Sequence, residues 1–245
     1  MKKLLTPWSA LLMLLFLLFV RIDDSSFIES VRMRYFDQLI NHKESTVSQQ
    51  VAVINIDDET IRKKGQFPFP RREYSSIITD LYSRSAGLVV FNIYMPDADR
   101  FGGDNTLADT FKKYPVILPH IAVHDKSHVK KVEPFRPGVS IIGDSNVGID
   151  YGSIHPNIEV LNNSAAGIGI VNVLPEIDGV TRRIPMVART DELLYPSITM
   201  EILRVAAGDS SFQIKANEGS IEAVRIPKFG KINTDTLGRI WVDWS

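Results

Sequence analysis

The sequence contains no cysteine, no excess of charge of either sign and no internal repeat. Without cysteine the chain forms no disulfide and offers no thiolate to a metal ion. A formal net charge of −1 provides no basic surface of the kind that binds nucleic acid, so that partner is not expected. The 245 residues are enough for one large domain or two small ones with a substantial buried core.

Long apolar runs are also missing, except for residues 4–20, which carry no charge at all. Lys2 and Lys3 precede this run and Arg21 follows it, as is typical of a signal anchor with a cytoplasmic N-terminus. The end of the run shows no small-residue cleavage pattern, so we favour a retained anchor over a cleaved signal peptide. We therefore predict a transmembrane anchor within residues 1–22, with the chain after Arg21 outside the cytoplasm.

A helix is expected directly after the anchor. Phe27, Val31 and Tyr35 recur at every fourth position and would form one apolar stripe on a helix. We interpret residues 23–40 as a stalk helix that leaves the membrane and residues 41–245 as the extracytoplasmic domain that it supports.

The first half of this domain predicts a parallel sheet. Residues 51–56 and 88–93 are apolar at nearly every position, as strands buried on both faces are, and "PVILPH" from Pro115 is a third such run. Amphipathic segments over 72–86 and 104–114 separate these runs and predict helices. The order βαβαβ favours a mostly parallel core with right-handed crossovers.

The second half, from about residue 125, predicts an antiparallel addition. Asp178-Gly179 stands between two strand-like runs and indicates a hairpin. "YPSITMEILRVAAG" is one more amphipathic helix that ends at Gly208, and the sequence from Ile221 onward alternates and turns like antiparallel strands. The expected fold class is therefore α/β, a mostly parallel core with an antiparallel β addition, preceded by one transmembrane helix and a stalk helix.

Three successive acids, "DDE", follow the first predicted strand. Sites in open α/β sheets lie beyond the carboxyl ends of strands, where Asp57 and, on the next strand, Asn92 are expected. Phosphotransfer enzymes of the haloacid-dehalogenase kind begin a D-x-D-x-T/V motif with a nucleophilic Asp, but that position here is Asn55. We favour a structural role in which Asp57 or Asp58 caps a short helix that runs through Lys64.

The string "FPFPRREY" combines two aromatic rings, two prolines of fixed φ and two arginines. Arg71 or Arg72 could clamp an anion. The structural alternative, which we favour, is that Pro68 and Pro70 set a turn and that Arg71 pairs with Asp57.

A serine hydrolase is the alternative from another functional class. "GDS" at residues 143–145 and "GSIHPN" at 152–157 resemble the first and the late block of the GDS(L) esterases, with Ser145 as nucleophile and His155 as base. The position of the orienting Asp in that late block is Gly152, and His155 follows Ser145 within ten residues instead of lying near the chain end. A turn is favoured, and a membrane-anchored periplasmic hydrolase remains the alternative function.

Three histidines, His120, His124 and His128, are spaced by four residues and would suit zinc if they lay on one face. Pro119 and the polar sequence that follows make solvated histidines the favoured interpretation. No metal ion and no cofactor is predicted.

Several of these segments together resemble the type-two CHASE domain. In chain order they are a strand ending at Asp57, the string "FPFPR", the strand-like "FNI" around Asn92, Asp104 with Leu107 and Ala108, "GIVN", "DGVTRR", "YPSITMEILRVAAG" and "INTDTLGRIWVDW". The similarity runs from about Asp23 to the last residue. Asn92 stands where the family tends to carry Asp, and the chain ends in what should be an interior strand, so we expect the domain to be incomplete at its C-terminus.

The resemblance implies an extracytoplasmic sensory domain in the inner membrane of a bacterium, with no catalysis of its own. Receptors of this family relay a signal to a cytoplasmic effector, such as an adenylate or guanylate cyclase or a histidine kinase, which would lie outside this chain. A small-molecule or protein ligand would shift the stalk helix between two packings, and a homodimer through that helix would transmit the change. As ligand-binding or latch residues we predict Asp57, Arg71, Asn92, Asp178 and Arg182.

Overall fold

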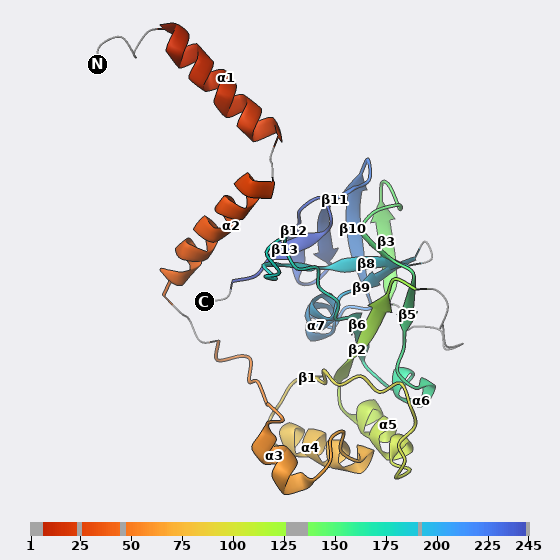
Figure 1. Ribbon diagram of the computed structural model, residues 1–245. Helices are drawn as coiled ribbons and strands as arrows, with labels where there is room; N and C mark the ends of the chain where they lie inside the picture. Colours follow the sequence, from red (N-terminus) through yellow and green to blue (C-terminus); the bar gives the residue numbers. More distant parts are fainter. Residues whose placement is uncertain (1–6, 24–25, 45–47, 126–136, 191–192, 244–245) are drawn as a thin grey trace. The chain divides into compact units, whose positions relative to one another are not determined.

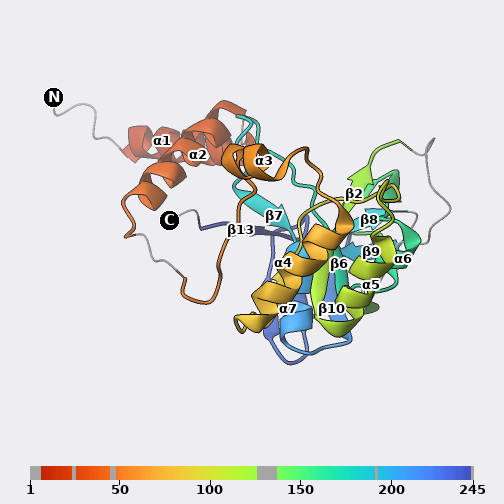
Figure 2. The ribbon, with the colours of Figure 1, turned by 90° about the horizontal axis from the view of Figure 1, so that it is seen from below.

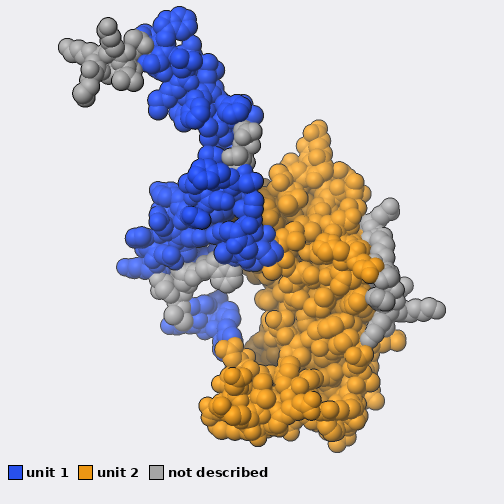
Figure 3. Space-filling view, in the orientation of Figure 1, with its two compact units in different colours: residues 1–53, 175–182, 242–245 blue, residues 54–174, 183–241 orange. Residues whose placement is uncertain are grey.

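The computed structural model describes residues 7–23, 26–44, 48–125, 137–190 and 193–243, and Figures 1 and 2 show it from two directions. The chain divides into two compact units, coloured separately in Figure 3. Unit 1 contains residues 1–53, 175–182 and 242–245, and unit 2 contains residues 54–174 and 183–241.

Unit 1 begins with helix α1 (Pro7–Asp23), which holds most of the apolar run and ends with Arg21 in its last turn. Among the described residues, no helix is both long enough and apolar enough to cross a membrane. The transmembrane anchor expected within residues 1–22 is thus not shown and stays a prediction.

Helix α2 (Ser26–Asn41) confirms the helix expected after the apolar run. Its apolar stripe, which includes Phe27, Val31 and Tyr35, is exposed, whereas Met33 on another face is buried. Asp37 follows Met33 by four residues and therefore lies on the same face of the helix. The Asp37 side chain itself is 42% exposed, and its ion-pair partner is described below.

Unit 2 is built around strand β2 (Val116–Val123), whose first five residues are buried. Strands β1 (Val89–Val90) and β6 (Gly167–Ile170) pair with its first half in parallel, with Val89 opposite Val116 and Gly167 opposite Ile117. Strand β5 (Ser153–His155) pairs with its last residues in the antiparallel direction. A parallel sheet with one antiparallel strand is therefore the centre of the unit.

Helices α4 (Arg71–Ser83) and α5 (Asp104–Lys113) pack side by side next to this sheet (Figures 1 and 2). Both were expected from their apolar spacing and are confirmed, although α4 ends three residues early because Ser85 takes a positive φ of 70°. Their inward residues form one buried cluster with the strands. It includes Tyr74, Ile78, Phe91, Leu107, Ala108, Phe111, Val116 and Leu118.

The first expected strand is absent. Residues 51–56 form no strand, and Val51, Val53 and Ile54 are 69%, 80% and 61% exposed. The second expected strand shortens to Val89–Val90, although Phe91 N–H still donates to Ile117 O at 2.8 Å. The prediction βαβαβ was wrong in its first strand, because an apolar run becomes a buried strand only where a neighbouring strand accepts its hydrogen bonds.

The antiparallel ending is confirmed. Strands β10 (Ser211–Asn217), β11 (Ser220–Ile226) and β12 (Gly230–Asn233) pair in antiparallel order, and β3 (Gly138–Ile142) adds to β10 in parallel. The remaining elements are β4 (Ile149–Tyr151) beside β8 (Val187–Thr190), β9 (Leu193–Pro196) beside β8, β7 (Arg183–Pro185) beside β13 (Arg239–Trp241), and the short helix α6 (Glu159–Asn162).

The hairpin expected at Asp178-Gly179 is a turn without a hairpin. Gly179 has a φ of 79° and donates its N–H to Glu176 O at 2.8 Å, so the turn itself is present. Strand β6 before it pairs with β2, and strand β7 after it pairs with β13. The Asp-Gly signal predicted the local backbone correctly, but the partners of the flanking strands are distant in the chain.

Helix α7 (Ile198–Ala206) is confirmed and contains a buried ion pair, whose Glu201 Oε2 also accepts the Ile168 N–H of β6 at 3.3 Å. Glu201 is fully buried, and Arg204 donates to its carboxylate through Nε at 2.6 Å and Nη2 at 2.7 Å. Burial raises the pKa of Glu201, although the hydrogen bonds from Arg204 oppose this effect. The strand comes this close because Gly167 has no side chain: a Cβ there would lie 2.6 Å from Glu201 Oε2.

We expect Glu201→Ala to lower the free energy of unfolding by about 3–5 kcal/mol, because it leaves the Arg204 charge buried without its carboxylate. Urea unfolding followed by circular dichroism measures the change. As a control, Glu59→Ala removes an exposed i,i+4 pair with Lys63 and should cost at most about 0.5 kcal/mol. Equal losses in the two variants would contradict the role of the buried pair.

Candidate functional site

Asp57 caps helix α3 (Asp58–Lys64), as the favoured structural interpretation predicted. Its Oδ1 accepts hydrogen bonds from Thr60 N–H at 2.8 Å and from the Thr60 hydroxyl at 2.6 Å, and Gly65 ends the helix. These hydrogen bonds lower the pKa of Asp57. The carboxylate therefore holds a helix end, and a catalytic role is not needed to explain it.

Arg71 does not pair with Asp57, so that prediction was wrong. The side chain of Arg71 is buried and donates through Nε to Asp104 Oδ1 at 3.3 Å and through Nη2 to the Asp97 carbonyl at 3.1 Å. Its partners come from the loop that follows β1 and from the first turn of α5, because α4 packs against α5 and not across the end of a strand at residues 51–56.

Asp99, in the loop between β1 and α5, connects this loop to the start of α4 by hydrogen bonds. Its carboxylate accepts backbone N–H groups from Arg71 at 3.1 Å, Phe101 at 3.2 Å and Gly103 at 3.0 Å. Burial opposes ionisation, but these hydrogen bonds and the Arg71 charge outweigh it and hold the pKa of Asp99 below its ordinary value. The loop is thus a rigid scaffold and not a free connection.

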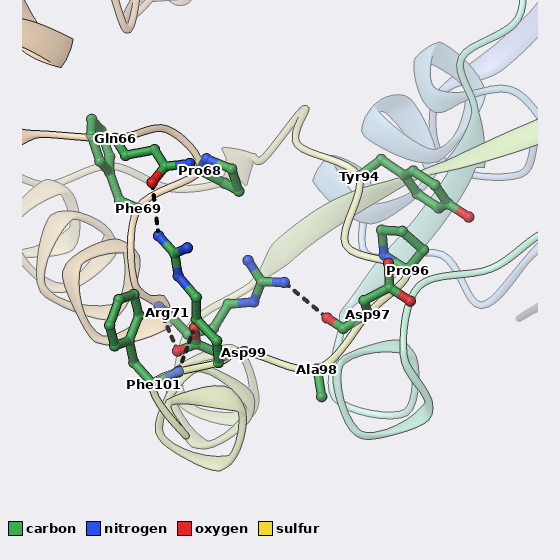
Figure 4. Close-up of a pocket in the computed structure, with 11 residues that line it drawn as sticks. Gln66, Pro68, Phe69, Arg71, Tyr94, Pro96, Asp97, Ala98, Asp99 and Phe101 are labelled. Carbon is green, nitrogen blue, oxygen red and sulfur yellow. Dashed lines mark hydrogen bonds between the residues drawn. The ribbon is translucent and has the colours of Figure 1, made fainter.

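A cavity of about 260 Å³ lies between this loop and the "FPFPR" string. Figure 4 shows the Arg71 guanidinium pointing between the two sides of the cavity, with Gln66 and Pro68 on one side and Tyr94 and Asp97 on the other. Asn92 is exposed just after β1 and is not among the lining residues. Of the three residues predicted at the sheet end, Asp57, Arg71 and Asn92, the cavity therefore contains only Arg71.

Unit 1 contains a second arginine cluster, and here two predicted residues do meet. Arg182 is 2% exposed and donates to Asp37 of α2 through Nε and Nη2, both at 2.7 Å. It also donates to Asp178 through Nη1 at 2.9 Å and Nη2 at 2.7 Å. One guanidinium therefore holds two carboxylates in bidentate geometry, the strongest arrangement of this kind.

The pKa values of the cluster follow from these contacts. The hydrogen bonds from Arg182 lower the pKa of Asp178 to about 2, and the Val180 N–H that Asp178 also accepts adds to this. The Arg182 hydrogen bonds lower the pKa of Asp37 as well, against the opposing effect of burial. All three groups are charged at neutral pH, so the cluster is an ion-pair network under physiological conditions.

The residues of the Arg182 cluster are adjacent in sequence to two strands, β7 and β13. Arg183 begins β7 directly after Arg182, and Trp241 ends β13 directly before Val242. Val242 N–H donates to Arg182 O at 2.8 Å, and Lys43, after the end of α2, forms an ion pair with Asp243. Helix α2 is therefore bound to the two segments that run on into the β7–β13 ribbon.

The hydrolase residues do not form a catalytic pair. Ser145 lies in an exposed bend whose shape is set by Asp144, which accepts Asn146 N–H at 2.8 Å and Gly219 N–H at 3.0 Å. His155 is in β5 opposite Ile121, and no hydrogen bond within the described part of the chain joins it to Ser145. The turn that was favoured for this segment fits the geometry.

The histidines are not alike. His120 lies in the central strand and is buried, so the prediction of a solvated side chain was wrong for it. Burial lowers its pKa to about 4, and its Nε2 lies 3.2 Å from Asn162 Oδ1. His124 stacks on Tyr151 with ring centroids 5.0 Å apart, and His128 lies outside the described residues. In the described ranges no three metal-ligating side chains gather.

Two important carboxylates were not predicted from the sequence. Asp37 shares a helix face with Met33, but the burial of that face is seen only in the structure. Asp104 was expected only as the first residue of a helix, and nothing in the sequence identified its ion pair with Arg71.

The low pKa of Asp178 gives a direct test of the Arg182 cluster. Because the folded-state pKa is depressed, the ion pair contributes stability above the ordinary value of 3.8, and this contribution is lost as the pH falls through about 2. In Arg182→Gln we expect the Asp178 midpoint, followed by carboxyl-carbon NMR, to rise toward 3.8.

A matched control is Arg189→Gln, which removes an arginine that pairs with Asp150 instead. This variant should leave the Asp178 midpoint near 2. An unchanged Asp178 midpoint in Arg182→Gln would contradict the cluster.

Comparison with known proteins gives one result. The family model of the CHASE2 domain matches residues 10–245, which is almost the whole chain. No curated protein and no solved structure matches it. The match agrees with the resemblance seen in the segments from Asp57 to the "INTDTLGRIWVDW" ending. The chain belongs to the CHASE2 family of sensory domains.

Proposed function

We propose that the chain is the extracytoplasmic, ligand-sensing input domain of a membrane-bound receptor in the bacterial inner membrane. It passes its signal to a cytoplasmic effector, a cyclase or a kinase, that lies outside this chain. The observation that carries the proposal is the bidentate ion pair between buried Arg182 and Asp37 of α2. Family membership supports the sensory role, and the ion-pair cluster supplies a means of transmission.

The order of elements along the chain supports this route. Helix α2 follows the apolar helix α1 after residues 24–25, and Lys2 and Lys3 precede the apolar run. We place the lysines in the cytoplasm and α1 in the membrane. Any change in how Arg182 holds Asp37 then acts on the helix that precedes the domain and, through it, on the anchor.

A ligand drives this change only if it binds one packing of α2 better than the other. Inverting a 1:99 population of the two packings requires a difference in binding free energy of about 5.5 kcal/mol. A bidentate ion pair suits such a switch, because its geometry makes the held and released states distinct.

We further propose that the receptor is a homodimer through α2. Phe27, Val31, Tyr35 and Leu39 are spaced by four residues and are 52–74% exposed. A stripe of this kind on a helix next to the membrane suits a self-complementary contact with a second copy about a twofold axis. The held face of α2, with Met33 and Asp37, is a different one and stays available for the cluster.

The membrane topology can be tested with reporter fusions. Alkaline phosphatase fused after residue 245 should be active in bacterial cells, because it folds only outside the cytoplasm, and a green fluorescent protein at the same position should be dark. Deleting residues 4–20 should reverse both results, since it removes the apolar run. If the phosphatase fusion of the intact chain is inactive and the fluorescent fusion is bright, the proposed extracytoplasmic location of the domain is wrong.

The switch can be tested by spin labelling, because the chain has no cysteine and Asn41→Cys provides one attachment site at the exposed end of α2, outside the proposed dimer contact. In Asp37→Asn the label should become more mobile at neutral pH, since one carboxylate of the network is lost. Electron paramagnetic resonance measures the mobile fraction.

Glu29→Gln is the matched control, because it removes a negative charge from the same helix outside the cluster. It should leave the label unchanged. Equal mobility in Asp37→Asn and the unmodified chain would show that Arg182 does not restrain α2.

A further inference from the structure

We propose that the cavity between the "FPFPR" string and residues 94–101 is the ligand site of the sensor and that it takes a small organic carboxylate. This inference rests on the proposed function and adds the class of ligand. The cavity lies entirely within unit 2.

Arg71 supplies the anion-binding group. It is 7% exposed, and its Nε and Nη2 are used by Asp104 and the Asp97 carbonyl. Its Nη1 has no hydrogen-bond partner among the described residues, and the guanidinium is directed at the cavity in Figure 4. A desolvated guanidinium with unused N–H donors binds a carboxylate oxygen more strongly than an exposed arginine does.

The surroundings hold Arg71 in place before any ligand arrives. Asp99 occupies its carboxylate oxygens with three backbone N–H groups, so it does not compete for Nη1. Gly103 permits this packing, because a Cβ there would lie 2.8 Å from Asp99 Oδ2 and 2.9 Å from Arg71 Cβ. A rigid donor loses little conformational entropy on binding, which favours affinity for a small molecule.

Arg100 supplies a second guanidinium. Its Cζ lies 4.8 Å from the centre of the Phe101 ring, and its Nη2 donates to Gln66 Oε1 at 3.3 Å. The hydrogen bond to Gln66 is long and joins a charged group to a neutral one, so a carboxylate would replace it with a stronger bond. Two guanidinium groups at one cavity can hold both oxygens of one carboxylate.

The walls fit an apolar body attached to that carboxylate. Phe69, Tyr94, Pro68 and Pro96 line the cavity. Its volume of about 260 Å³ is below the ~300–1,000 Å³ of sites for drug-sized ligands, so a small metabolite is the expected size. Asp97 also lines the cavity, and its carbonyl accepts the hydrogen bond from Arg71 Nη2.

The experiment is a binding titration of the full chain by calorimetry with three probes. Phenylacetate carries a carboxylate and a ring, phenylalanine adds an amino group, and inorganic phosphate provides an anion without an apolar body. We expect saturable binding of phenylacetate or phenylalanine below about 10 mM, a weak limit on the affinity scale. Tighter binding of phenylalanine than of phenylacetate would show that the site also binds the amino group.

Arg100→Gln should weaken that binding at least about tenfold, because it removes one charge-assisted partner. Arg84→Gln is the matched control, since Arg84 is exposed at the end of α4, pairs with Asp80 and is not among the cavity residues. It should leave binding unchanged. Arg71→Lys should also lose binding, and its thermal unfolding reports separately whether the domain still folds.

No saturation with either carboxylate, binding of phosphate alone, or equal affinity in Arg100→Gln and Arg84→Gln would each overturn the site. A chain that passes the fusion and spin-label tests but binds no carboxylate would lose this inference and keep the proposed function. If the chain binds a carboxylate but its phosphatase fusion is inactive, the ligand site is kept and the proposed extracytoplasmic function is lost.

Discussion

The ion pairs of the buried Arg182 guanidinium are the interaction on which the proposed sensory function depends. A charge removed from water is tolerated only with partners, and here two carboxylates supply them. One of the two, Asp37, belongs to the helix that follows the apolar run, and the other, Asp178, lies four residues from Arg182 in the chain. Local and distant segments are thus joined at a single side chain, directly before the first residue of β7.

Local features of the structure were predictable, and pairings distant in sequence were not. Helices α4, α5 and α7 follow from apolar spacing, and the Asp57 cap follows from a carboxylate just ahead of a short helical segment. Residues 51–56 were predicted to be a buried strand because the sequence pattern shows that they are apolar. The pattern does not show whether another strand lies beside them to pair with. The same limit applies to the turn at Gly179, whose flanking strands pair elsewhere.

The candidate sites show the same division. Asp178 and Arg182 could be paired from sequence because four residues separate them, whereas Asp37 lies 145 positions from Arg182. Arg71 was expected to pair with a carboxylate, but the choice of Asp104 over Asp57 depends on how the loop at 97–103 folds onto α4. The spacing of Met33 and Asp37 places both on one face of α2, but the burial of Met33, which identifies that face, is known only from the structure.

The buried arginines Arg182 and Arg204 differ in the number of carboxylates that they bind, and this number decides whether one ion pair can open while the arginine stays paired. Among the described residues Arg204 pairs with one carboxylate, that of Glu201, so separating them would leave a buried charge without a counter-ion. Arg182 has two, and when α2 withdraws Asp37 the guanidinium keeps Asp178 through the local turn. Release of α2 therefore costs one ion pair without leaving an unpaired buried charge. The proposed switch at α2 needs this property, and of these two arginines only Arg182 has it.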